Sequence, residues 1–350
     1  MRIRPLFFCL PLLALLAACA KTDAPVRLDF VGATGLLSGN RTVGAGDTLV
    51  THAYAVGNDK LLKNLRIEVS YTPGPTPILY PIPTSSFDAA NAPKALTLVY
   101  LDSVLSVSPT DKARGGEFLF VNGLMARTTS GQETWTYTAT DQGNQMAARR
   151  YRLTVRKTDS AAVFHNYSLV LRPVPRKAPR PASVRDARRV YLSLRYGLLL
   201  PRHAVLNNTN SLQANQAFVD LIAVADAAGT AVSLVAPADA SFSNSSTQTW
   251  PLDRRRATEV HATGLTTTQF ANAATTAGFV AAFNASKPYE PATGPATGPA
   301  KNNTGPLTSG QVIAFKAFDD SGKEYYGLLQ VTAFTGGTNP LLTCLVKVQK

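Results

Sequence analysis

The chain has 350 residues and a formal net charge of +13, with 45% hydrophobic and 16% charged residues. This length suits two ordinary domains, and the apolar fraction excludes an intrinsically disordered chain. Threonine, serine, alanine, glycine and proline are abundant, which is typical of an exported all-β protein. The positive charge predicts an acidic partner, but no nucleic-acid-binding motif accompanies it, so we expect no nucleic acid among the partners.

Residues 1–18 have the pattern of a lipoprotein signal peptide. Arg2 and Arg4 form a positive region, an apolar run follows, and Leu16-Ala17-Ala18 leads to Cys19. The run is too short for a membrane-spanning helix, which needs about 20 apolar residues. An ordinary secretory signal is the alternative. We therefore predict a lipid such as palmitate on Cys19, a tether over 19–25, and a lipid-anchored protein of the cell envelope, at the outer membrane.

Residues 26–157 read as a series of short strands separated by turn residues. Apolar and polar residues alternate over 65–71, which is strand periodicity. The clearest part is a predicted hairpin over 131–155, in which Trp135 and Tyr137 alternate with threonines and a turn follows at 141–144. The string Trp-Thr-Tyr-Thr-Ala-Thr-Asp-Gln-Gly-Asn, followed by Tyr-Arg-Leu-Thr-Val, resembles the last two strands of bacterial immunoglobulin-like modules. The resemblance implies an immunoglobulin-like β-sandwich.

A linker is predicted at 158–166, and residues 167–350 form a second β-rich domain, a β-sandwich or a jelly-roll-like body. Three features interrupt its strands: an exposed basic loop at 172–189, one helix at 267–284, and a flexible loop at 287–308 with repeated Ala-Thr-Gly-Pro. Cys344 is the remaining cysteine of the mature chain. It lies in an alternating apolar run, which indicates a buried strand position and an unreactive thiol.

Enzyme signatures are scarce in this sequence. The four histidines are far apart, and none has a second histidine or cysteine at zinc-ligand spacing. Asp319 and Asp320 are adjacent and read as turn formers rather than as the two carboxylates of a glycosidase. We therefore expect no catalytic residue, no metal and no cofactor.

Possible ligand contacts lie in one stretch of the second domain. The ring of Trp250 could present a flat apolar surface to a sugar, and the run Arg254, Arg255 and Arg256 could bind an anionic group. Core packing is the alternative for the tryptophan, and a solvated face is the alternative for the arginines.

The order of lipid-bearing cysteine, immunoglobulin-like module and larger β domain resembles uncharacterised cell-envelope lipoproteins of Bacteroidetes. More loosely, it is similar to starch-utilisation-type binding lipoproteins. The resemblance implies a non-catalytic protein for ligand binding or adhesion, with the first domain as spacer. The expected partners are the membrane, through the N-terminal lipid, and a glycan or anionic polymer or an outer-membrane protein. Two alternatives stay open: a polysaccharide-active enzyme with its site in the second domain, and a structural accessory subunit of an outer-membrane complex.

Overall fold

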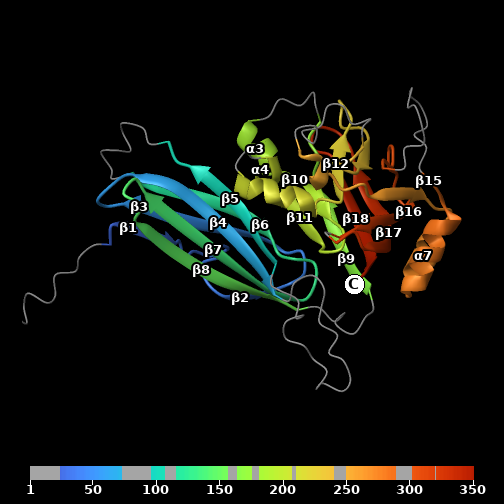
Figure 1. Ribbon diagram of the computed structural model, residues 1–350, viewed down its shortest axis with the longest axis horizontal. Helices are drawn as coiled ribbons and strands as arrows, with labels where there is room; N and C mark the ends of the chain where they lie inside the picture. Colours follow the sequence, from blue (N-terminus) through green and yellow to red (C-terminus); the bar gives the residue numbers. More distant parts are fainter. Residues whose placement is uncertain are drawn as a thin grey trace, which may run out of the picture.

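The computed structural model describes residues 24–72, 96–106, 116–156, 164–175, 181–206, 210–239, 250–288, 302–319 and 321–350. The predicted signal peptide and Cys19 lie outside these residues. The molecule is mainly β, as predicted, and its strands form two units that lie end to end (Figure 1). The predicted linker at 158–166 is too long at its end, because residues 164–166 already pair with β18 as part of β9, and its other residues lie outside the described ranges. No described sheet mixes strands from the two units.

The first unit is a sandwich of two sheets. Its strands are β1 (Val26–Phe30), β2 (Arg41–Val43), β3 (Thr48–Gly57), β4 (Leu62–Thr72), β5 (Leu96–Val104), β6 (Phe118–Met125), β7 (Gly131–Asp141) and β8 (Met146–Val155). One sheet has the order β1-β3-β6 and the other β2-β8-β7-β4-β5. The pairings are antiparallel except that β2 runs parallel to β8. This distribution of strands is that of an immunoglobulin-like sandwich.

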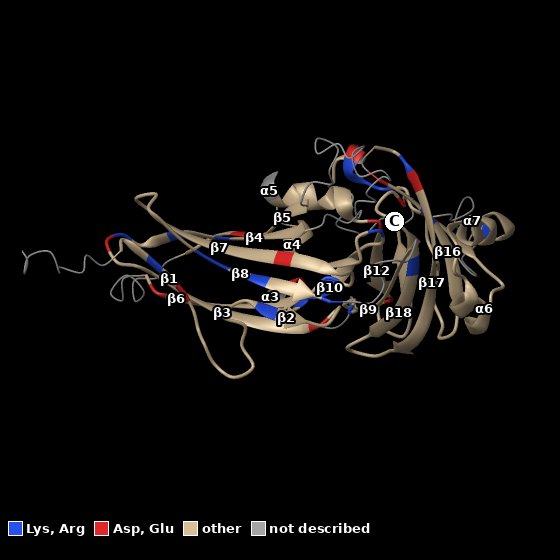
Figure 2. Ribbon diagram, turned by 90° about the horizontal axis from the view of Figure 1, so that it is seen from below, with Lys and Arg blue, Asp and Glu red and all other residues tan. Residues whose placement is uncertain are grey.

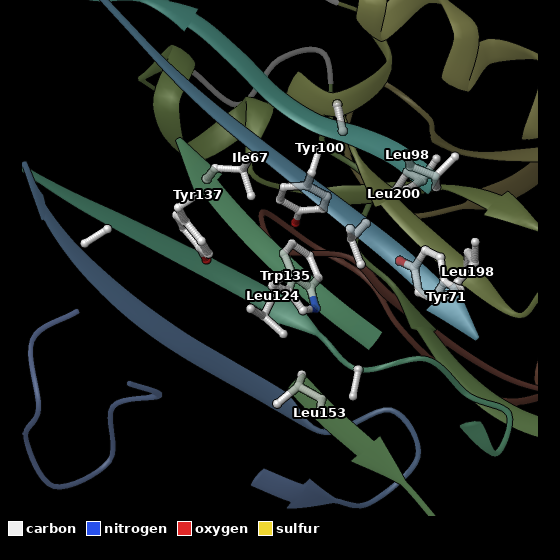
Figure 3. Close-up of a cluster of buried hydrophobic side chains, with 14 of the residues drawn as sticks. Ile67, Tyr71, Leu98, Tyr100, Leu124, Trp135, Tyr137, Leu153, Leu198 and Leu200 are labelled. Atoms are coloured by element: carbon white, nitrogen blue, oxygen red, sulfur yellow. The ribbon is translucent and has the colours of Figure 1, made fainter. Parts of the chain in front are cut away.

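The predicted hairpin supplies the largest side chains of this core. Trp135 lies opposite Tyr151 in the register of β7 and β8, and both are buried. Figure 3 shows Trp135 and Tyr137 among aliphatic side chains from the other strands. The buried phenols are hydrogen-bonded: Asn122 Nδ2 donates to the Tyr137 hydroxyl at 2.7 Å, and Tyr151 pairs with Thr51 at 2.9 Å. The core therefore tolerates tyrosine because each hydroxyl has a partner.

The second unit also consists of two facing antiparallel sheets. Its strands are β9 (Phe164–Leu171), β10 (Arg189–Ser193), β11 (Leu198–Pro201), β12 (Leu221–Ala225), β13 (Val232–Val235), β14 (Glu259–Ala262), β15 (Lys287–Pro288), β16 (Val312–Phe318), β17 (Glu324–Thr335) and β18 (Leu341–Gln349). The orders are β11-β10-β12-β13 and β15-β14-β16-β17-β18-β9. Leucines from the first sheet and Phe315 and Cys344 from the second share one core. The second unit is therefore a β-sandwich. Burial raises the pKa of the Cys344 thiol, which agrees with the prediction that this thiol is unreactive.

The prediction of one continuous helix at 267–284 is wrong in detail. The structure has two helices there, α6 (Thr267–Asn272) and α7 (Thr276–Ala285), because Ala273 is extended and Thr275 caps the second helix by accepting from the Gly278 N–H at 3.1 Å. Both cover the outer face of the six-stranded sheet. Short helices occur elsewhere too: α3 (Ala182–Asp186), α4 (His203–Leu206), α5 (Asn210–Gln213), and the 3-10 turns η4 (Ala214–Phe218) and η6 (Leu252–Arg254).

The two units share a hydrophobic core at their junction. Tyr191, Leu198 and Ile222 of the second unit belong to the same cluster as the buried residues of the first sandwich. The Thr128 hydroxyl donates to the Gly197 carbonyl at 2.8 Å. Gly197 has φ +60°, and a Cβ there would lie 1.9 Å from Thr128 Oγ1, so this contact requires glycine. The junction is thus a packed interface.

Two predicted loops are more ordered than expected in their described parts. In the basic loop, Asp186 lies 3.0 Å from Arg185 and 3.4 Å from Arg202, while Arg189 Nη2 donates to the Gly123 carbonyl of the first unit at 3.4 Å. In the flexible loop, Thr304 is fully buried and its N–H donates to the Leu234 carbonyl at 3.0 Å. The basic segment is predicted to be an exposed loop, but it contains α3, and Asp186 pairs with two of its neighbouring arginines. The composition of 287–308 predicts flexibility, but Thr304 pairs with the edge of β13.

Candidate functional site

A buried polar network lies within the second unit. Asp220 is fully buried and accepts hydrogen bonds from Arg256 Nη1 at 2.8 Å, from the Leu194 N–H at 2.7 Å and from the Tyr325 hydroxyl at 3.0 Å. Burial raises the pKa of Asp220, and the guanidinium of Arg256 opposes that shift. The network holds the Tyr325 ring in one position, because its hydroxyl has a fixed acceptor.

Tyr325 connects this network to a second ion pair. The guanidinium of Arg195 lies 5.6 Å from the centre of the Tyr325 ring, and its Nη1 donates to Asp319 Oδ2 at 2.9 Å. The Arg195 side chain is only 9% exposed. The other Asp319 oxygen accepts from the N–H groups of Ser321 at 3.0 Å and Lys323 at 2.9 Å. Asp319 is thus the turn former that the sequence predicts, and it also orients Arg195; Asp320 lies outside the described residues.

Burial alone would raise the pKa of Asp319. The hydrogen bonds from Ser321, Lys323 and Arg195 outweigh it, so the pKa lies below its ordinary value. The carboxylate therefore stays ionised at neutral pH and keeps the Arg195 guanidinium in place.

This arrangement forms the wall of a surface hollow of about 240 Å³ between the β16–β17 turn, the start of α7 and the end of β18. Its lining residues are Arg195, Thr276, Lys323, Glu324, Tyr325, Gln349 and Lys350. Three of them have basic side chains, one of which, Arg195, is paired with Asp319, and Glu324 has the one acidic side chain among them. Because sites for drug-sized ligands usually measure about 300–1,000 Å³, the hollow suits one small unit of a larger ligand.

Glu324 is already engaged at the rim of the hollow. Its Oε2 accepts from the Tyr326 hydroxyl at 2.7 Å, and its Oε1 lies 3.6 Å from Lys316 Nζ. These contacts hold the pKa of Glu324 below its ordinary value, the Tyr326 hydrogen bond most of all. The amide of Gln349 spans the other side, with Oε1 accepting from the Tyr326 N–H at 2.8 Å. The Gln349 Nε2 donates to the Thr276 carbonyl at 3.5 Å, so the groups that the hollow offers to an incoming anion are its basic side chains.

The structure places Trp250 away from this hollow. The side chain is 2% exposed, and its ring lies 5.9 Å from that of Tyr191 in the shared core. The prediction of a ligand contact is therefore wrong for Trp250, and the core-packing alternative is correct. The large apolar ring is buried because the junction of the two units covers it.

The three predicted arginines do not form one exposed cluster. Arg255 Nε donates to the Trp250 carbonyl at 2.9 Å, and Arg256 is in the buried pair with Asp220. Arg254 is half-buried. Arg256 is linked to the hollow through Asp220 and through its own Nη1, which lies 3.5 Å from the Tyr325 hydroxyl, so it is a positioning residue that acts through Tyr325.

Sequence reasoning missed the residues that line the hollow. Arg195 and Lys323 are in turns, and Lys350 follows the last strand, so they come from distant parts of the chain. The one indication of this hollow in the sequence is that three of its lining residues, Lys323, Glu324 and Tyr325, are adjacent in the predicted hairpin. Within the described part of the chain, no group of three or more His, Cys, Asp or Glu residues could hold a metal ion, and no helix is long and apolar enough to span a membrane.

Comparisons with known proteins give no family for the chain. No family model matches it, and no curated protein matches it. Among solved structures, a DUF4466 family protein from Parabacteroides merdae is 9% identical, with a TM-score of 0.32, over 93% of this chain and 99% of that one. The CARDB domain of a Pyrococcus furiosus protein, solved with two metal ions, is 11% identical over 37% and 91%, with a TM-score of 0.21. The sporulation control protein Spo0M from Bacillus subtilis is 10% identical over 61% and 79%, with a TM-score of 0.23. At these values none of the likenesses supports a function.

Proposed function

We propose that the protein is a lipid-anchored protein of the cell envelope, at the outer membrane, that binds a glycan or polymer with acidic groups and does not transform it. The observation that carries the proposal is the hollow lined by Arg195, Lys323 and Lys350. In the sequence, Cys19 supports the location in the cell envelope. The net charge of +13 supports an acidic ligand. The first unit acts as the spacer between lipid and binding unit.

Binding would use Arg195, whose orientation is fixed, and two lysines with flexible side chains, Lys323 and Lys350. Arg195 is held in orientation by Asp319 and by the face of Tyr325, so its planar guanidinium is preorganised for a carboxylate or sulfate. Lys323 and Lys350 have flexible stems that can close on the same group. The small volume favours recognition of one acidic unit at a time, with the rest of the polymer outside.

The lining of the hollow supports binding better than the alternative of polysaccharide hydrolysis. Hydrolysis of a glycosidic bond generally uses two carboxyl groups on either side of it. Glu324 has the one carboxylate side chain among the described lining residues, and the Tyr326 hydroxyl and Lys316 already contact it.

The test is a glycan array probed with the chain that begins after Cys19. We expect binding to acidic oligosaccharides and none to their neutral counterparts. Lys323→Gln removes one charge-assisted contact and should weaken binding about tenfold. Lys287→Gln, at an exposed lysine of β15 outside the hollow, is the matched control and should bind as wild type. Failure across acidic glycans, or equal binding by Lys323→Gln, would overturn the proposal.

The anchor is tested separately. Labelled palmitate should enter the wild-type protein in cells and should not enter the Cys19→Ala variant, which is expected in the soluble fraction of the envelope. Unchanged labelling in that variant would exclude Cys19 as the lipid site.

A further inference from the structure

Arg195 lies in the turn of a hairpin that packs against both units. The turn spans residues 194–197 and joins β10 to β11. Side chains of β11 alternate between the two cores: Leu198 and Leu200 belong to the cluster that fills the first sandwich, and Leu199 belongs to the core of the second. Figure 3 shows Leu198 and Leu200 among the aromatic side chains of the first unit. The turn is therefore positioned by contacts with both units.

The second unit holds the beginning of this turn. The Leu194 N–H donates to Asp220 Oδ2 at 2.7 Å, and the Leu194 carbonyl accepts from the Tyr167 hydroxyl. Asp220 and Tyr167 are both buried, so water does not compete for these hydrogen bonds. The residue before Arg195 is thus fixed from within the second unit.

The first unit holds the end of the turn. The Thr128 hydroxyl donates to the Gly197 carbonyl at 2.8 Å, and Thr128 is 1% exposed. Gly197 has a φ of +60°, and a Cβ on it would lie 1.9 Å from Thr128 Oγ1 and 3.4 Å from the Tyr167 ring. So close an approach requires glycine. A hydrogen bond between the two units, which lie end to end in Figure 2, is therefore two residues away from Arg195.

The segment that carries Thr128 is itself buried and hydrogen-bonded. It connects β6 to β7, and Arg127, Thr128 and Thr129 in it are all buried. The Arg127 N–H donates to the carboxyl group of Glu133, and Arg127 Nε donates to Thr129 Oγ1 at 2.9 Å. These contacts lie within the first unit. The first unit therefore presents the Thr128 hydroxyl to the hairpin from a fixed position.

A fixed turn matters because it decides where the guanidinium of Arg195 can lie. Asp319 and Tyr325 hold the end of this side chain, and the turn holds its backbone. If one end of the turn were released, an incoming anion would have to order Arg195 on binding, and such ordering lowers affinity. The hydrogen bond between the units therefore acts on the hollow without touching the anion.

We propose that Thr128 is a positioning residue of the hollow. Through the Gly197 carbonyl it holds the turn in which Arg195 faces the bound anion, so the first unit takes part in binding and is more than a spacer. The effect on affinity rests on the proposed function, whereas the effect of Thr128 on the turn can be measured without a ligand.

The binding test is a calorimetric titration of the chain that begins after Cys19 with an oligogalacturonate, well below the melting temperature. Thr128→Val keeps the shape of the side chain but removes the hydroxyl, so it should weaken binding about fivefold. Thr128→Ser keeps the hydroxyl and should bind within about twofold of wild type. Thr51→Val is the matched control, because it removes a buried hydroxyl that pairs with Tyr151 at 2.9 Å in the core of the first sandwich. It should bind as wild type.

A double-mutant cycle shows whether the effect passes through Arg195. In an Arg195→Gln background, Thr128→Val should cause no further loss of affinity. In a Lys323→Gln background, it should again weaken binding about fivefold, because Lys323 is not held by this turn. An equal loss in both backgrounds would mean that Thr128 acts on the whole fold, and it would overturn the inference.

Hydrogen exchange of the ligand-free chain tests the positioning by itself. The amides of residues 194–198 should exchange at least about threefold faster in Thr128→Val than in wild type, whereas those of β18 should not change. Unchanged exchange at 194–198, faster exchange throughout both units, or unchanged affinity of Thr128→Val would overturn the inference. If wild type does not bind the oligogalacturonate, the proposed function fails, and the exchange at 194–198 still decides whether Thr128 holds the turn.

Discussion

At the residue scale, the buried carboxyl of Glu133 makes stability depend on pH. Glu133 is fully buried on β7 and accepts hydrogen bonds from the Arg127 N–H and, at 2.8 Å, from Trp135 Nε1. Burial raises the pKa of Glu133 to about 7, against the opposing effect of these hydrogen bonds. Its folded-state pKa is thus above its value of 4.5 in the unfolded chain.

Between these two pKa values the folded state binds the extra proton. The contribution of Glu133 to stability is therefore fully present below pH 4.5 and is lost as the pH rises through about 7. The total change is about 3 kcal/mol. Urea unfolding at pH 5 and pH 8 should show wild type less stable at pH 8, whereas Glu133→Gln should lose most of this difference. The exposed Asp59→Asn is the control and should keep it, and a Glu133→Gln variant with the wild-type difference would contradict the assignment.

At the element scale, Lys347 shows why strand patterns alone mislead. Leu342, Cys344, Val346 and Val348 face the core of the second unit, as the alternation predicts. The intervening positions would be expected to face solvent, yet Lys347 is buried because α6 and α7 cover that face. Alternation reports which residues share a face, and it does not report what covers the other face.

Replacing Lys347 tests this packing. Its Nζ donates to the carbonyls of Phe270 at 2.9 Å, Ala271 at 2.7 Å and Ala273 at 2.8 Å, where α6 ends. Lys347→Met should lower the free energy of unfolding by about 2–4 kcal/mol, because these carbonyls lose a charged donor. Lys63→Met, at an exposed site, should change it by less than about 0.5 kcal/mol. Equal stability of the two variants in urea denaturation would show that the buried contacts contribute nothing.

At the scale of the whole molecule, the shared core couples the two units. Trp250 and Tyr191 belong to the hydrophobic cluster that fills the first sandwich. We therefore expect one cooperative transition in calorimetry. Trp250→Ala should destabilise both units together by about 3–5 kcal/mol. Two resolved transitions, with only one moved by the substitution, would mean that the units fold independently.

The parts of this architecture differ in how far the sequence could predict them. The hairpin of β7 and β8 follows from local alternation and a turn, so its residues were assigned correctly. The hollow depends on Arg195, Lys323 and Lys350, which meet only after the sheets have paired. The sequence leaves core packing and ligand contact open for Trp250, and only the junction of the two units decides for core packing.

The central claim is that the hollow binds an acidic group, and calorimetric titration with an oligogalacturonate tests it most directly. The methyl-esterified oligosaccharide serves as the neutral counterpart of the same size. We predict that wild type binds the acid and not the ester, that binding weakens with salt, and that Lys323→Glu abolishes it. Equal binding of acid and ester, or undiminished binding by Lys323→Glu, would contradict the account.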